Sequence, residues 1–223
     1  MVTPLKKTAL HELISKPVLF DANIFMVGIS ERISDERYSF ENMKQLYIIP
    51  LFESFTNIYI HEEVYKELDD KNRTFVDMYK EKNVSIVGED GLYGKDPRYT
   101  ILFNNIATHE LVKYKRGESK NRGEVYSLAY AAYHNMNFFC SKEIMVDIVA
   151  GELNDLKDVD IITFDVILLQ AYVYYAQQNN NTNSKGLKAI YKKYCADVIK
   201  RHGLPKTLGE YIKASQRYLV NAP

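Results

Sequence analysis

The stretch Val18-Leu19-Phe20-Asp21-Ala22-Asn23 decides the fold, because a short apolar run ends there at an acidic residue. The apolar run, which starts at Pro17, predicts a buried β-strand. A carboxylate directly after a buried strand is costly unless it is paired or bound to a metal ion. Asp21 is therefore either a ligand of such an ion or the cap of a following helix.

Strand-like and helical segments alternate along the rest of the chain. Short apolar runs predict strands at residues 57–60, 84–87, 138–140 and 159–163. Helical spacing covers residues 41–55, with Pro50 expected to kink or split it, and 61–68, 75–79, 99–112, 123–135, 144–156 and 164–176. The alternation predicts a three-layer α/β/α fold with a mostly parallel central sheet.

A polar, turn-prone break at residues 179–184 separates this pattern from two further helices. The second of these helices starts at Thr207-Leu208-Gly209-Glu210, which has the spacing of a capping box. We therefore expect a domain at residues 1–178 and a helical C-terminal extension at residues 179–223 packed on it. Residues 28–38 are polar and predict a loop.

Three further acidic residues stand in comparable contexts. Glu67 and Glu124 lie in helical patterns, and Glu143 follows the apolar run at residues 138–140. Carboxylates at the carboxyl ends of parallel strands converge on one crevice, and several of them repel one another unless a hard divalent cation lies between them. The competing interpretations are a solvated acidic face for Glu67, on which Glu63 also lies, and a favourable helix-start position for Glu124 and Glu143.

Polar neighbours of these acids have two interpretations each. Asn23 either orients Asp21 through a hydrogen bond or caps the helix that follows. Ser141 either holds a ligand or a phosphate, or caps the helix after it. Asp147, one helical turn after Glu143, is the alternative acid at that position.

The net charge is zero, but it is unevenly distributed. Nine basic and two acidic residues between Lys185 and Arg217 give this part +7, and the rest of the chain balances it with −7. A neutral chain is unlike a general nucleic-acid coat protein. Two groups of basic residues could instead contact phosphates, or simply be solvated. The first is the basic loop before Glu124, with Lys113, Lys115, Arg116, Lys120 and Arg122. The second is Lys188, Lys192 and Lys193, which lie away from the apolar face of their helix.

Several classes of protein are disfavoured. Two cysteines, Cys140 and Cys195, make no disulfide framework, and neither has zinc-ligand spacing to another Cys or His. The apolar run at residues 17–29 is interrupted by Asp21 and Asn23, and it is too short to span a bilayer. We expect a soluble protein of the cytoplasm with no membrane partner.

The order of these acidic segments resembles that of the PIN-domain ribonucleases. The strand followed by Asp21-Ala22-Asn23 is similar to the start of that domain, and Val64-Tyr65-Lys66-Glu67-Leu68 is similar to its first acidic helix. Gly123-Glu124-Val125 resembles the second acidic helix, and Ser141-Lys142-Glu143 resembles the strand that ends in Thr-x-Asp. The order and rough spacing agree from about Pro17 to Ile167.

The resemblance implies an endoribonuclease that uses Mg²⁺ or Mn²⁺, with Asp21, Glu67, Glu124 and Glu143 as catalytic metal ligands and Asp147 as a substitute. It also implies a toxin-type or RNA-processing role. The candidate partners are RNA, a protein antitoxin and a second copy of the chain. Two other functions stay open: a catalytically inactive module that binds RNA or protein, and a phosphatase that uses Asp21 as a nucleophile. The phosphatase usually has a second acid where Asn23 stands.

Overall fold

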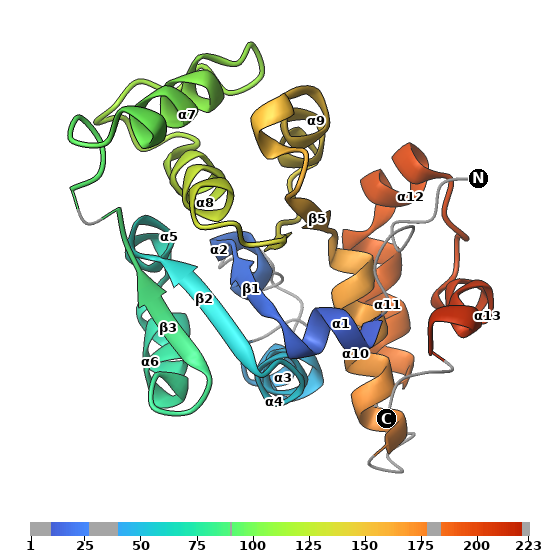
Figure 1. The fold of residues 1–223 in the computed structure, drawn as a ribbon. Helices are drawn as coiled ribbons and strands as arrows, with labels where there is room; N and C mark the ends of the chain where they lie inside the picture. Colours follow the sequence, from blue (N-terminus) through green and yellow to red (C-terminus); the bar gives the residue numbers. More distant parts are fainter. Residues whose placement is uncertain (1–9, 27–39, 90, 178–183, 220–223) are drawn as a thin grey trace. The chain divides into compact units, whose positions relative to one another are not determined.

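The computed structural model describes residues 10–26, 40–89, 91–177 and 184–219 (Figure 1). Five parallel strands form one sheet in the order β3-β2-β1-β4-β5. Their bounds are β1 (Pro17–Phe20), β2 (Asn57–His61), β3 (Val84–Val87), β4 (Phe138–Cys140) and β5 (Asp160–Ile162). Helices flank this sheet, so the expected three-layer α/β/α class is confirmed. The expected loop at residues 28–38 lies outside the described residues.

β1 occupies the centre of the sheet and sets where the polar residues after the strands lie. Phe20 at its end stands opposite Ile60 of β2 and Cys140 of β4. The backbone N–H of Asp21 then donates to the carbonyl of Cys140 over 3.0 Å, which extends the pairing by one step. The residues that directly follow β1 and β4 are therefore neighbours at the same edge of the sheet.

Both faces of the central strands are buried, which explains why these strands read as continuous apolar runs. Leu19 and Phe139 point into a core that also holds Phe103, Val125 and Leu128 from the helices. The alternate residues of β1 and β2, which face the other way, are buried as well: Val18, Phe20, Ile58 and Ile60. Both cysteines are buried and free, as expected from their spacing.

The chain divides into two compact units, which we call the sheet unit (residues 17–25 and 57–161) and the helical unit (residues 1–16, 26–56 and 162–223). The expected boundary between residues 178 and 179 stays a prediction. The helices of the sheet unit are α2 (Ala22–Phe25), α5 (Glu62–Glu67), α6 (Asp70–Tyr79), α7 (Pro97–Thr108), α8 (Arg122–Tyr133), α9 (Ile144–Glu152) and the short turn η3 (Asn154–Leu156).

The helices of the helical unit are α1 (Leu10–Ser15), α3 (Phe40–Met43), the π-helical turn η2 (Lys44–Ile48), α4 (Ile49–Ser54), α10 (Phe164–Gln177), α11 (Ser184–Tyr194), α12 (Ala196–His202) and α13 (Leu208–Leu219). The pattern at residues 41–55 thus consists of three consecutive segments. Pro50 has no N–H to donate to the carbonyl four residues earlier, so the helical ladder is interrupted at that point, as expected.

A buried hydrogen-bond network joins α10 to α13 inside the helical unit. Asp165 is fully buried, and it accepts hydrogen bonds from the hydroxyls of Thr163 and Tyr211, each over 2.6 Å. At the start of α13 the N–H of Glu210 donates to the Thr207 hydroxyl over 3.3 Å, which is the helix cap that the sequence predicts. Among the described residues, no helix is both long and apolar enough to cross a bilayer.

A candidate carboxylate site at the edge of the sheet

Asp21 is a buried carboxylate with all its contacts supplied by the two neighbouring strand ends. Only 2% of the residue is exposed. One oxygen accepts the Ala22 N–H over 2.7 Å. The other accepts the Asn23 side-chain amide over 2.6 Å and the Ser141 hydroxyl over 2.9 Å. The position of this carboxylate is therefore fixed from β1 and from β4 together.

Asn23 connects the same two strand ends. α2 begins at Ala22, so Asn23 lies inside that helix, and the expectation that it caps the helix is wrong. Its side-chain oxygen instead accepts the N–H of Lys142 over 2.9 Å, while its amide holds Asp21. The expected hydrogen bond from Asn23 to Asp21 is thus present. Ser141 has a double role, since its hydroxyl donates to Asp21 and accepts the N–H of Glu143 over 3.1 Å.

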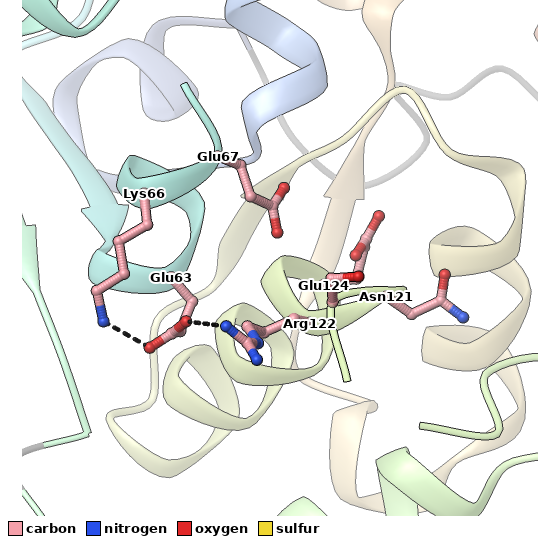
Figure 2. Close-up of a pocket in the computed structure, with 7 residues that line it drawn as sticks. Glu63, Lys66, Glu67, Asn121, Arg122 and Glu124 are labelled. Atoms are coloured by element: carbon pink, nitrogen blue, oxygen red, sulfur yellow. Dashed lines mark hydrogen bonds and ion pairs between the residues drawn. The ribbon is translucent and has the colours of Figure 1, made fainter. Parts of the chain in front are cut away.

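Glu67 and Glu124 come together where the end of α5 meets the start of α8 (Figure 2). A carboxylate oxygen of Glu67 accepts the N–H of Gly123 over 3.2 Å. A Cβ atom at Gly123 would stand 3.0 Å from that oxygen and 3.1 Å from a methyl group of Val64. The glycine therefore lets the two helices approach closely enough for Glu67 to reach the residue next to Glu124.

These acids are close enough to change one another's protonation. Burial raises the pKa of Asp21 well above its usual value, and the charges of Glu124 and Glu67 add to the rise. Burial and the charge of Glu124 raise the pKa of Glu67 to about 7. Burial and the charge of Glu143 raise the pKa of Glu124 as well. The folded chain thus holds four acids in one electrostatic neighbourhood, in which each added negative charge is unfavourable.

Glu63 shares the face of α5 with Glu67 but is neutralised by cations. Its carboxylate accepts Lys66 over 2.7 Å and lies 3.4 Å from Arg122 (Figure 2). Burial works against ionisation of Glu63, yet Lys66 and Arg122 together hold its pKa below the usual value. Of the two acids on this helix face, Glu67 is therefore the one that joins the acidic cluster.

A cavity of about 250 Å³ opens between these groups. Its lining combines carboxylates, cations and small polar side chains: Glu63, Lys66, Glu67, Ser119, Asn121, Arg122 and Glu124. Lys66, Ser119 and Asn121 were not singled out from the sequence. Lys66 could have been found from the sequence, because it directly precedes Glu67. Ser119 and Asn121 could not, because they reach the cavity through the fold of the loop before α8.

The remaining predicted residues are placed as follows. Glu143 is exposed, stands directly before α9, and reaches the cluster through its charge on Glu124. Asp147 lies in the first turn of α9, where it is half-buried. Lys120 is exposed in the loop before α8. The three lysines of α11 are exposed and belong to the helical unit: Lys188, Lys192 and Lys193.

The donor chemistry at this edge suits a hard divalent cation, since the candidate ligands are carboxylates and Asp21 is buried among like charges. Within the part of the chain that the structure describes, however, no three Asp, Glu, His or Cys side chains are arranged so that they could hold one ion. The geometry therefore brings the acids within electrostatic range of one another without forming a closed set of ligands.

Comparisons of the chain with family models, with curated proteins and with solved structures found no match.

Proposed function

We propose that the chain is a metal-dependent endoribonuclease of the PIN type, with Asp21, Glu67, Glu124 and Glu143 as the acids that hold Mg²⁺ or Mn²⁺. The observation that carries this proposal is the convergence of a buried Asp21 with Glu67 and Glu124, in which the charge of Glu124 raises the pKa of both other acids. A fold keeps several repelling carboxylates together at a cost in stability, and a bound cation removes that cost. Asp147 is the substitute ligand if Glu143 does not take part.

Each residue then has a defined task. A divalent cation, when bound, supplies a water of lowered pKa and neutralises negative charge on the scissile phosphate. Asn23 and Ser141 orient Asp21 through the hydrogen bonds described above. Lys66 and Arg122 lie at the same cavity and can contact phosphate oxygens of the bound strand.

One observation favours a second candidate, a catalytically inactive module that binds RNA or protein. It is the lack, among the described residues, of three ligands arranged for one ion. The phosphatase is disfavoured, because Asn23 stands where that chemistry usually has a second acid, and its side-chain amide holds Asp21 instead. A protein antitoxin, a second copy of the chain and a location in the cytoplasm remain part of the proposal.

The deciding experiment is a cleavage assay on a mixture of labelled RNAs with the wild-type chain and Asp21→Asn. We expect cleavage in Mg²⁺ or Mn²⁺, none in EDTA, and little support from Zn²⁺, since no His or Cys belongs to the site. Asp21→Asn should lower the rate roughly a hundredfold or more, because it removes the charge that binds the cation. Its melting temperature should change little, since removal of an unfavourable buried charge offsets the hydrogen bond that is lost when an amide NH2 replaces one acceptor oxygen.

Asp77→Asn is the matched control, because it removes a carboxylate that pairs with Lys80 on the exposed side of α6. It should leave cleavage unchanged. Wild-type rates from a folded Asp21→Asn chain, or full activity in EDTA, would refute the nuclease.

A further inference from the structure

The loop between α7 and α8 carries an arginine whose flat guanidinium is held in a fixed orientation. Arg116 donates to a carboxylate oxygen of Glu89 over 3.0 Å and to the hydroxyl of Tyr126 over 3.4 Å. Its guanidinium carbon lies 4.2 Å from the centre of the Tyr93 ring. Three different partners therefore fix this group, where a surface arginine is ordinarily free to rotate.

The partners of Arg116 are themselves fixed. The Tyr93 ring meets Phe103 edge-to-face at 5.0 Å, and its hydroxyl donates to Asn104 over 3.1 Å. The Glu89 side chain is only 11% exposed. The arginine thus stands on a rigid aromatic base and is anchored by a nearly buried acid.

The same arginine remains half exposed, at 51% of its side chain, although it has all these contacts. The exposed half of the side chain is open to a second flat group. A guanidinium plane stacks well on nucleobases, and such stacking needs a base that is not already covered by its neighbours in a duplex.

The loop that carries Arg116 also contributes to the carboxylate cavity. Ser119, three residues later in the same loop, lines that cavity, as does Arg122 at the start of α8. Tyr126, which contacts Arg116, lies one helical turn after Arg122. The loop and the start of α8 thus carry both the Arg116 surface and residues that line the cavity.

We propose that the Arg116–Tyr93 pair is a stacking site for an unpaired nucleobase, so that the chain takes single-stranded nucleic acid. This inference rests on the proposed nuclease function and adds the kind of strand it acts on. Unlike a lysine-rich surface, which attracts any polyanion, a flat site distinguishes a strand that has bases from one that lacks them.

The test compares two hexanucleotides that have the same ribose-phosphate backbone, one carrying six adenines and one fully abasic. Their affinities are measured by fluorescence anisotropy in EDTA, so that binding is read without cleavage. Phosphate contacts are the same for both strands and cancel in the comparison. We expect the wild-type chain to bind the adenine strand about tenfold more tightly. A duplex in which every adenine is paired with uracil should compete poorly with the single adenine strand for the chain.

Arg116→Lys keeps the positive charge and removes the planar guanidinium. The variant should therefore bind the adenine strand no more tightly than the abasic strand. Arg98→Lys is the matched control, because Arg98 is an exposed arginine that lies over another ring, Tyr133, at 5.6 Å. It should keep the tenfold preference. If Arg116→Lys does not fold, fluorescence quenching of a 2-aminopurine strand by the wild-type chain reports stacking directly.

Equal affinity of the wild-type chain for both strands, no binding of either, or the same loss in Arg98→Lys would overturn the stacking site. These results are distinguishable from failure of the proposed function. A chain that prefers the adenine strand but never cleaves RNA contradicts only the nuclease, and a chain that cleaves but ignores the bases contradicts only the stacking site.

Discussion

Asp21 and Glu67 are acids that are harder to ionise in the folded chain than in the unfolded chain. Their pKa values rise through burial and neighbouring charge, so the folded chain binds more protons than the unfolded chain between the usual pKa and the raised one. Stability must therefore fall as the pH increases through this range. For Glu67 the range runs from 4.5 to about 7.

We accordingly expect the free energy of unfolding in EDTA to decrease between pH 5 and pH 7.5, and Glu67→Gln to reduce this decrease. Urea titrations of the wild-type chain and of Glu67→Gln at the two pH values measure this change in the free energy of unfolding. Addition of Mg²⁺ at pH 7.5 should restore part of the lost stability, because the cation binds the ionised acids. An identical pH dependence in the wild-type chain and in Glu67→Gln would remove Glu67 from the cluster.

Glu143 and Asp147 compete for the last position among the acids. The charge of Glu143 reaches Glu124, whereas Asp147 is not among the groups that raise the pKa of Glu124. We therefore expect Glu143→Gln to lower cleavage roughly tenfold or more and Asp147→Asn to have the smaller effect. Parallel rate measurements on the two variants decide, and the reverse order would transfer the ligand role to Asp147.

At the scale of elements, the contact between α5 and α8 controls where Glu67 lies. Gly123→Ala would place a methyl group 3.0 Å from the Glu67 carboxylate, so the acid or the helix has to move. We expect this variant to lose about 1–3 kcal/mol of stability and most of the cleavage activity. Thermal melts and cleavage rates test both effects.

Gly151→Ala provides the comparison, because Gly151 lies in α9 and no atom stands within 4 Å of an added Cβ. The same substitution there should increase stability by up to about 1 kcal/mol, since alanine favours the helix and restricts the unfolded chain. If both alanine variants behaved alike, the close approach at Gly123 would have no consequence for the site.

The predicted bounds of the helices and strands agree with the observed ones in some elements and differ in others. The strand at residues 138–140 was predicted with its observed bounds, because both faces of the sheet are covered and the apolar run is continuous. The prediction for 99–112 was displaced: α7 starts at Pro97, capped by the Asp96 side chain, and ends at Thr108. The sheet order did not follow from periodicity, because β1 pairs with strands far apart in the chain.

Some residues of the candidate site could be predicted from the sequence, whereas the contacts between them could not. Asp21 and Ser141 could be singled out because each directly follows a strand. The pairing of Arg122 with Glu63 could not be, because it depends on how α5 packs against α8. The fixed orientation of Arg116 depends likewise on a loop that brings it to Glu89 from 27 positions away in the sequence.

At the scale of the whole molecule, the acidic cluster and the basic surface of α11 belong to different units. Leu187, Ile190 and Tyr191 are fully buried, so α11 packs through one face and exposes its lysines. We expect that replacing Lys188, Lys192 and Lys193 together by alanine weakens RNA binding at low salt and lowers the salt slope by roughly two units. Thermal stability should stay nearly unchanged.

The matched control replaces three exposed lysines of the sheet unit that line no part of the cavity: Lys71, Lys95 and Lys157. Both triple variants change the net charge equally, so only a local phosphate contact separates them. Equal salt slopes in the two variants would leave α11 as a structural cover or a protein-binding surface.

The central place of β1 also bears on how the protein is made. Asp21 leaves the ribosome before its partner Ser141, which follows 120 positions later in the chain. At ordinary speeds of translation this interval lasts roughly 6 to 24 seconds. During that time the first strand has no β4 to pair with, and the aspartate has no serine to orient it. Under the proposed function, a nascent chain therefore has no oriented Asp21 for RNA cleavage until most of the sheet unit has been synthesised.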